Sequence, residues 1–92
     1  MTLKKLGKYM QAIRLAADAS QQDIADLCAF SSAQFISNIE RGLTIPSPVA
    51  IKAYSVVTGT HHDDIISHVI SHQRSEMWKA VDAAKIYKKR GS

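Results

Sequence analysis

Two short helical patterns stand close together between residues 20 and 42, and this spacing limits the possible folds more than any other feature. Ser20 followed by Asp23 is typical of a capping box, in which a hydroxyl and a carboxylate bond the free amides at a helix start. A second helix is expected from near Ser31 to just before Gly42, since glycine suits the position after a helix. Only about three residues then link the two helices, which forces a sharp crossing of the helix-turn-helix kind.

Three further helices are expected around this unit. One precedes it, because apolar residues recur there at steps of three and four. These apolar residues are Leu3, Leu6, Met10, Ile13 and Ala17. Ser47 followed by Pro48 indicates the start of a helix that ends at Gly59. Thr60 with Asp63 forms another capping-box pattern, which predicts the start of a last helix.

The stretch after Thr60 decides the domain organisation. Neither glycine nor proline interrupts residues 60–90, so the last helix can continue into a tail helix or break near Gln73. With 92 residues and an apolar composition of 46%, the chain suits one compact domain. We expect an all-α, five-helix domain over residues 1–73, followed by a helical extension with a basic tail over residues 74–92.

The sequences SQQDIA at residues 20–25 and FISNIERG at residues 35–42 resemble the helix-turn-helix family of phage Cro and repressor proteins. The resemblance covers roughly residues 6–70 and implies a Cro/repressor-like fold whose second motif helix reads the major groove of DNA. Between Ala25 and Ile36 this chain has one residue more than the family usually shows. We expect the extra residue in the turn or at the start of the second motif helix.

A capping box and a hydrophobic staple are expected at the start of the second motif helix. Ser31 as the cap and Gln34 would complete a capping box there, and Phe30 would pack on Phe35 as a hydrophobic staple. Ala29 stands where members of the family often have a turn glycine.

One face of the second motif helix is expected to read DNA bases. Ile36 and Ile39 face the core, so polar residues at steps of three, four and seven occupy the opposite face. Amide side chains can bond the N7 and N6 edge of adenine, a serine hydroxyl can bond either kind of edge, and an alanine methyl can touch thymine. We therefore expect some preference for A·T pairs. The candidate base-reading residues are Ala33, Gln34, Ser37 and Asn38.

Phosphate contacts are expected beside this helix, because most protein–DNA hydrogen bonds go to the DNA backbone. Arg41 and Thr44 are candidates at its end, and the resemblance assigns a phosphate contact to Gln21 at the start of the preceding helix. The resemblance also implies an ion pair between Arg14 and Glu40. Its role would be to fix the angle between the helices that carry these two residues rather than to add much net stability.

An apolar stripe runs along the last helix and past the expected end of the domain. Its residues are Ile65, Ile66, Val69, Ile70, Met77, Trp78 and Val81. The part beyond the domain end either packs on its own domain or joins the rest in a homodimer interface. We favour the interface, because one recognition helix contacts too few base pairs for useful specificity.

The chain has four histidines, which raise the question of a metal site. His68 and His72 share a helix face at a spacing that can bind zinc, but they form no H-E-x-x-H motif and have no cysteine partners. Solvated histidines are the favoured interpretation, also for His61 and His62 beside Asp63, and we expect no metal and no cofactor. The sequence shows no glycine-rich phosphate loop, nucleophile elbow or paired carboxylates in a predicted pocket, so we expect no enzyme.

The net charge and the cysteine content indicate which partners and which cellular compartment suit the chain. The net charge of +4 favours a polyanionic partner only modestly. Cys28 is the single cysteine, so it cannot form an internal disulfide, and a reducing compartment fits it best. Without a signal peptide or an apolar stretch of about 20 residues, the chain is expected in the cytoplasm and away from membranes.

These patterns together predict a sequence-specific DNA-binding transcriptional regulator that binds double-stranded DNA at a near-palindromic operator as a homodimer. Repression is the commoner outcome in the family. A second candidate is an antitoxin or another protein-interaction module that uses the same fold. A further protein partner, RNA polymerase or a toxin, is left open by the sequence.

Overall fold

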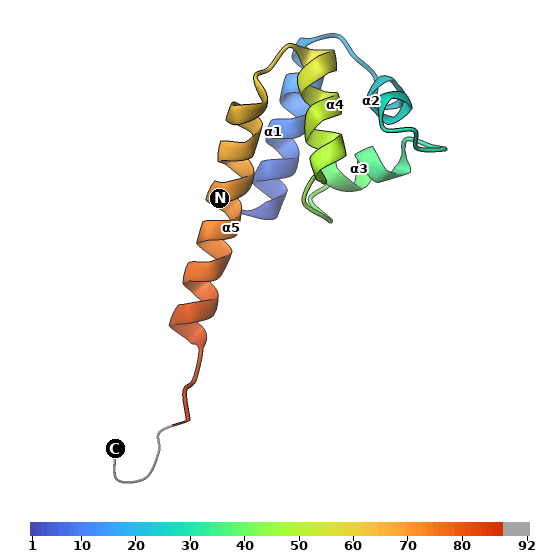
Figure 1. Cartoon of the computed structure of the whole chain (residues 1–92). Coiled ribbons are helices and arrows are strands. Elements are labelled where there is room, and N and C mark those ends of the chain that lie inside the picture. The colour runs from blue at the N-terminus through green and yellow to red at the C-terminus, as the bar shows by residue number, and fades with distance from the viewer. Residues whose placement is uncertain (88–92) are drawn as a thin grey trace.

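The computed structural model describes residues 1–87, which form five helices and no strand (Figure 1). The helices are α1 (Leu3–Ala16), α2 (Gln21–Leu27), α3 (Gln34–Glu40), α4 (Pro48–Thr58) and α5 (His62–Ala83). α1, α4 and the first half of α5 pack together, and α2 and α3 pack against α1 and α4 on the other side (Figure 1). The predicted all-α, five-helix architecture is confirmed. Within the described residues, no helix has the length and apolar character needed to cross a bilayer.

One apolar core joins all five helices. Each helix supplies at least one side chain that is completely shielded from solvent. Examples in chain order are Met10, Ile24, Ile36, Tyr54 and Ile65. α2 and α3 have only seven residues each, which is too short for a stable helix in water. Both helices therefore depend on this core for their structure.

Side-chain caps fix the starts of α2 and α4 where the sequence predicts them. The hydroxyl of Ser20 accepts from the amide of Asp23 (3.0 Å), and the Asp23 carboxylate accepts from the amide of Ser20 (2.8 Å), which is the predicted capping box. Ser47 caps α4, and Pro48 is its first residue. The two helix starts are thus set by local sequence.

The start of α5 differs from the prediction. Nδ1 of His61 accepts a hydrogen bond of 3.2 Å from the amide of Asp63, so His61 is the cap and the helix begins at His62. The expected capping box between Thr60 and Asp63 is wrong, because the imidazole occupies the place that the threonine hydroxyl would need. An imidazole nitrogen without a proton accepts from a backbone amide as a hydroxyl oxygen does.

α5 is one continuous helix through Gln73, so the last helix extends into the tail without a break. The domain boundary expected after residue 73 stays a prediction. Residues 88–92, the end of the expected basic tail, lie outside the described residues.

The first half of α5 supplies the residues of this helix that are buried against the rest of the chain. Its buried residues are Ile65, Val69 and His72. We call residues 1–72 the head, from which the remainder of α5 projects (Figure 1). Ile65 and Val69, expected in the homodimer interface, are 0% and 7% exposed. They are buried within the single chain, so their assignment to the interface is corrected.

The amino terminus ties α1 to the projecting helix. The Met1 ammonium donates a hydrogen bond of 3.0 Å to the hydroxyl of Ser75. Nδ1 of His72 lies 3.0 Å from the carbonyl oxygen of Met1. His72 thus holds a structural position against α1, which is a different role from the solvated one expected for the histidines.

Candidate nucleic-acid interface

α3 turns one face to the core and the other away from it. Ile36 and Ile39 are 0% and 1% exposed, so the helical register counted from them is confirmed. Gln34 and Arg41 are exposed, and Ser37 and Asn38 are half-buried. The structure thereby brings four of the predicted DNA-contacting residues onto the side of α3 that lies opposite the two core isoleucines.

Two of these side chains bond one another. Nε2 of Gln34 donates a hydrogen bond of 2.9 Å to Oδ1 of Asn38, one helical turn away. The bond orients both amides, because a fixed acceptor oxygen also fixes the position of the NH2 group. Nδ2 of Asn38 keeps both protons, and Oδ1 keeps its second lone pair. Asn38 thus retains the donor and the acceptor that adenine N7 and N6 require.

The start of α3 differs from the prediction. Ala33 occupies the N-cap position, and no side chain caps the helix there. The amide of Gln34 donates to the hydroxyl of Ser32 (3.3 Å). The expected box of Ser31 and Gln34 is wrong. Ala33 is partly buried and packs on the core, and its assignment to thymine reading stays a prediction.

The turn between α2 and α3 spans residues 28–33, which is longer than the three residues expected. The amide of Phe30 bonds the carbonyl of Ala25 (3.1 Å), and Ala29 adopts φ +57°. This is the left-handed region in which glycine costs least, and it explains why glycine is common at this position. Phe30 and Phe35 pack with ring centroids 5.0 Å apart, so the predicted contact between them is confirmed.

The segment after α3 lies close to the start of α1. Gly42 has φ +74°, and a β-carbon at this residue would stand 2.7 Å from Cα of Lys4. The backbone of Lys4 therefore lies next to Gly42, which follows Arg41 in the chain, and Lys4 and Arg41 are both exposed. Thr44 is half-buried, and its hydroxyl donates to the carbonyl of Ile45 (3.3 Å). The position of Lys4 could not be predicted from the sequence, because only the packing of α1 on α3 places its backbone here.

Gln21 is the first residue of α2, and its side chain is engaged inside the protein. Nε2 donates a hydrogen bond of 3.1 Å to Oε1 of Glu40. The bond leaves one Nε2 proton and the Oε1 oxygen of Gln21 without a partner in that interaction. Gln21 therefore links α2 to the end of α3, and its contact with a phosphate stays a prediction.

A buried charge network lies behind the outward face of α3. Arg14 and Glu40 form two parallel bonds of 2.8 Å, from Nε to Oε2 and from Nη2 to Oε1, so the pair implied by the resemblance is present. The hydroxyl of Tyr54 donates to Oε2 (2.7 Å), and Gln21 donates to Oε1. Nη1 of Arg14 donates to the carbonyl of Ala19 (2.9 Å). Four helices thus meet at one carboxylate.

The network keeps Glu40 ionised. Burial by itself raises the pKa of this carboxyl, but the hydrogen bonds from Arg14, Tyr54 and Gln21 together lower the pKa below its ordinary value. The bond to Glu40 raises the pKa of the Arg14 guanidinium. Burial first, and then the bond to Glu40, raises the pKa of Tyr54. The role of Tyr54 could not be predicted from the sequence, because this residue follows the apolar pattern of its helix.

Gly7 explains how closely α1 and α3 approach. A β-carbon at this residue would stand 2.6 Å from the carbonyl oxygen of Glu40 and 2.7 Å from that of Ile39. These distances are shorter than real contacts, so only glycine allows the crossing. The packing and the charge network therefore hold the same end of α3.

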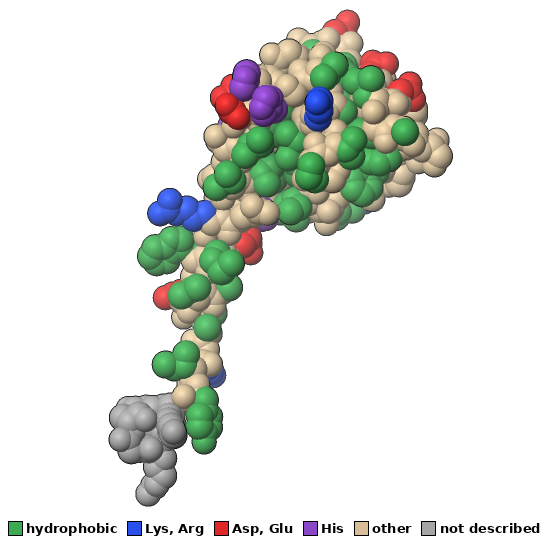
Figure 2. All heavy atoms as spheres, in the orientation of Figure 1, with side chains coloured by type: hydrophobic (Ala, Val, Ile, Leu, Met, Phe, Trp, Pro, Cys, Tyr) green, Lys and Arg blue, Asp and Glu red, His purple; other side chains and the backbone are tan. Residues whose placement is uncertain are grey.

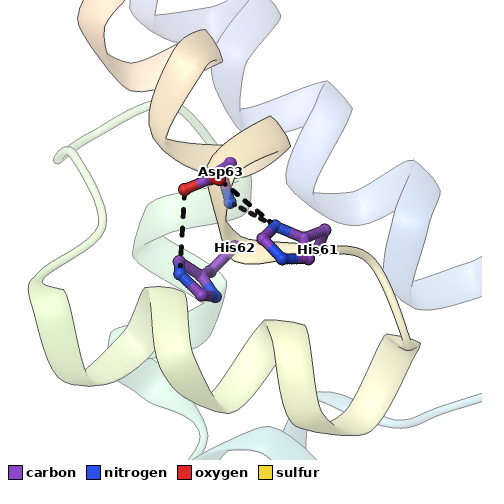
Figure 3. Close-up of side chains that lie close together, drawn as sticks. All are labelled: His61, His62 and Asp63. Atoms are coloured by element: carbon purple, nitrogen blue, oxygen red, sulfur yellow. Dashed lines mark hydrogen bonds and ion pairs between the residues drawn. The ribbon is translucent and has the colours of Figure 1, made fainter.

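A second polar cluster lies at the start of α5 (Figure 3). Nδ1 of His61 and Nε2 of His62 lie 3.6 and 3.7 Å from the carboxylate oxygens of Asp63, and the two rings stack. All three side chains are exposed. Nδ1 of His61 already accepts the capping bond, and the positive end of the helix dipole disfavours a cation. Helix capping accounts for this arrangement.

The chain matches the family model described as helix-turn-helix over residues 10–65, which is more than half of its length. No significant match was found among curated proteins. No significant match was found among solved structures either. The matched range contains α2, the turn and α3, together with Arg14, Glu40 and Tyr54 of the charge network. The chain therefore belongs to the Cro/C1-type helix-turn-helix family, whose members are DNA-binding regulators.

Proposed function

We propose that the protein is a sequence-specific transcriptional regulator that inserts α3 into the major groove. The observation that carries this proposal is the outward face of α3, where the side-chain amides of Gln34 and Asn38 are hydrogen-bonded to each other. Glu40, on the buried side, holds α3 in position through its bonds to Arg14. Preorganised donors and acceptors need no reordering on binding, which favours base discrimination.

Asn38 and Gln34, with Ser37 beside them, are the proposed base-reading residues. Asn38 would bond N7 and N6 of adenine, and the bond from Gln34 would hold its amide plane in place. The exposed side chains of Arg41 and Lys4 would contact phosphates at one end of α3. Gln21 and Thr44 are further phosphate candidates, Gln21 through the resemblance and Thr44 through its place after α3.

We further propose that the protein acts as a homodimer on a near-palindromic operator and represses by blocking polymerase. Large apolar side chains that the head leaves uncovered support a dimer: Ile70, Met77, Trp78 and Val81 are 55–67% exposed, and Ile66 is half-buried. Two copies would give two recognition helices for half-sites about one helical turn apart. Transcription in vitro from a promoter that overlaps the selected site tests repression, since added protein should lower transcript yield.

Selection of bound fragments from random DNA tests the proposal directly. The expected result is an inverted repeat with A·T-containing half-sites. Asn38→Ala should weaken binding to the selected site by about tenfold to a hundredfold and leave binding to unrelated DNA nearly unchanged. Gln11→Ala, an exposed amide on α1, is the matched control and should bind as the wild type does. Recovery of fragments without any common sequence would overturn the proposal and favour a protein-interaction module.

A further inference from the structure

The second half of α5 is unusual for a helix surrounded by water. Met77, Trp78 and Val81 are each about two thirds exposed, at 65%, 67% and 65%. The described part of the chain measures 61 × 25 × 18 Å and has a radius of gyration of 16.7 Å. A compact chain of this length would have a radius of gyration of about 12 Å. A helix that projects this far with large apolar side chains is typical of an interaction surface.

The exposed side chains continue a surface that begins on the head. Ile66, Ile70, Met77 and Val81 follow one another at steps of four, seven and four, so they share one face of α5, which we call the outer stripe. Ile66 also forms one wall of a groove of about 490 Å³ between α4 and α5. Ile51 and Val56 form much of the opposite wall. Figure 2 shows hydrophobic side chains on the head and again along the projecting helix.

The outer stripe is self-complementary in one orientation. Ile70 and Met77 lie at equal distances from the midpoint between Gln73 and Arg74, and so do Ile66 and Val81. If two copies of α5 pair antiparallel around this midpoint, Ile70 of each copy faces Met77 of the other, and Ile66 faces Val81. Such a contact uses the same surface on both subunits, as twofold symmetry requires.

We propose that two copies of this chain pair through α5 in the antiparallel orientation, so that the end of each helix covers the α4–α5 groove of the other copy. Val81 of the second copy would lie over Ile66 at the edge of the groove, with Trp78 of that copy beside it. The homodimer itself is part of the proposed function, and the inference rests on it. The antiparallel orientation and the residues that pair are new.

The exposed area is sufficient for such a dimer. Each of the large exposed side chains of the stripe offers on the order of 100 Å², and Trp78 offers more. With Val56 in the groove wall, the pairing would bury roughly 500 Å² per copy and about 1,000 Å² in total, the threshold for a specific interface.

Charge favours the antiparallel over the parallel orientation. Asp63 lies on the same face of α5 as the stripe, because it precedes Ile70 by seven residues. Parallel helices would bring the two Asp63 carboxylates together. Antiparallel helices place Asp63 opposite Ala84, where α5 of the other copy ends just before Lys85, and they oppose the two helix dipoles.

Cysteine pairing distinguishes the orientations. Ile70→Cys and Met77→Cys are made separately, oxidised alone and after co-expression, and resolved on non-reducing gels. The expected result is a covalent dimer only in the co-expressed mixture, because like residues would be separated by about two helical turns along the pair and a disulfide needs α-carbons within about 7 Å. The wild type controls for Cys28, which is buried. A covalent dimer of either variant alone, or none in the mixture, would overturn the antiparallel pairing.

A charge variant supplies an independent readout. Met77→Glu should shift the molar mass measured by light scattering from dimer to monomer at low micromolar concentration. Lys79→Glu lies on the opposite side of α5 and should leave the mass unchanged. If the wild type selects a common DNA sequence but the mixed cysteine variants form no covalent dimer, the proposal of antiparallel pairing is overturned and that of a sequence-specific regulator is supported. If the mixed variants form a covalent dimer but no DNA sequence is selected, the regulator proposal is overturned and the pairing is supported.

Discussion

The hydroxyl of Tyr54 donates a 2.7 Å hydrogen bond to Oε2 of Glu40, the same oxygen that accepts from Nε of Arg14. One carboxylate therefore closes a contact between α1, α3 and α4, and Gln21 adds α2 through the other oxygen. Within the described residues, buried side-chain oxygens and nitrogens all have a hydrogen-bond partner. The network satisfies its own polar groups, and the loss of one member leaves the others unpaired.

Breaking the network from one side should destabilise the protein more than removing it. We expect Arg14→Met alone to lower the free energy of unfolding by about 3–5 kcal/mol, because Glu40 is left as an unpaired buried charge. Arg14→Met combined with Glu40→Leu and Tyr54→Phe should cost less than that single change. Urea unfolding followed by circular dichroism measures both. A triple variant that is less stable than Arg14→Met would contradict the expectation.

Stability should fall in acid because of Glu40. The pKa of this carboxyl is lower in the folded protein than its ordinary value, so the unfolded chain takes up the proton first as the pH falls. The contribution is complete above about pH 4.5, the ordinary value, and is lost as the pH decreases through the folded pKa. Urea midpoints between pH 7 and pH 3 should decline more steeply for the wild type than for Glu40→Gln. Parallel curves would show that Glu40 carries no such linkage.

Gly7→Ala should disrupt the crossing of α1 and α3. The added methyl would stand 2.6 Å from the Glu40 carbonyl oxygen, so the helices must separate, at a cost of about 1–3 kcal/mol. Alanine is otherwise the better helix former, and without the clash the same change would stabilise α1. Thermal unfolding gives the sign. Lys8→Ala at the adjacent exposed position is the control and should change the melting temperature little.

Ala29→Gly should stabilise the turn. Ala29 has φ +57°, where a β-carbon costs roughly 1 kcal/mol that glycine avoids. Glycine also loses more conformational freedom on folding, so a net gain of a few tenths to 1 kcal/mol is expected. Ala12→Gly, at an exposed position inside α1, should lose about 1 kcal/mol. Equal losses from both substitutions would show that the turn is not strained at Ala29.

Arg41→Ala should weaken binding to all DNA sequences alike. A phosphate contact carries no sequence information, so affinity for the selected site and for unrelated DNA should decrease together. The slope of log affinity against log salt between about 50 and 200 mM should become shallower by about 1. Lys79→Ala on the projecting part of α5 keeps the slope of the wild type and serves as the control. A change confined to the selected site would instead make Arg41 a base-reading residue.

The sequence predicts those parts of the fold that depend on local signals. Ser20, Ser47 and Gly42 mark helix ends by hydrogen bonding or by backbone freedom, and the structure places helix ends at all three. The inward face of α3 follows from the spacing of Ile36 and Ile39. These features need no knowledge of distant contacts.

The predictions that failed depend on distant contacts or on a missing signal. α3 starts three residues after Ser31, because Ala33 occupies its cap position and alanine gives no capping signal. Tyr54 and Gly7 act only where α4 and α1 meet Glu40, so spacing along one helix cannot single them out. Ile65 follows the same apolar pattern as Ile70, yet only the packed fold shows which of them is covered.

The residues of α3 that hold the fold together are different from those on its outward face, which affects how the sequence can change in evolution. Folding depends on Ile36, Ile39 and Glu40, which point inward. The side chains of Gln34 and Asn38 lie on the opposite side and bond each other. Substitutions at those two positions would leave the core intact, so a duplicated gene could acquire a new operator in a few mutational steps without losing a foldable product. Because the buried carboxylate and the core isoleucines hold α3 in place, its outward face can change while the position of the helix stays the same.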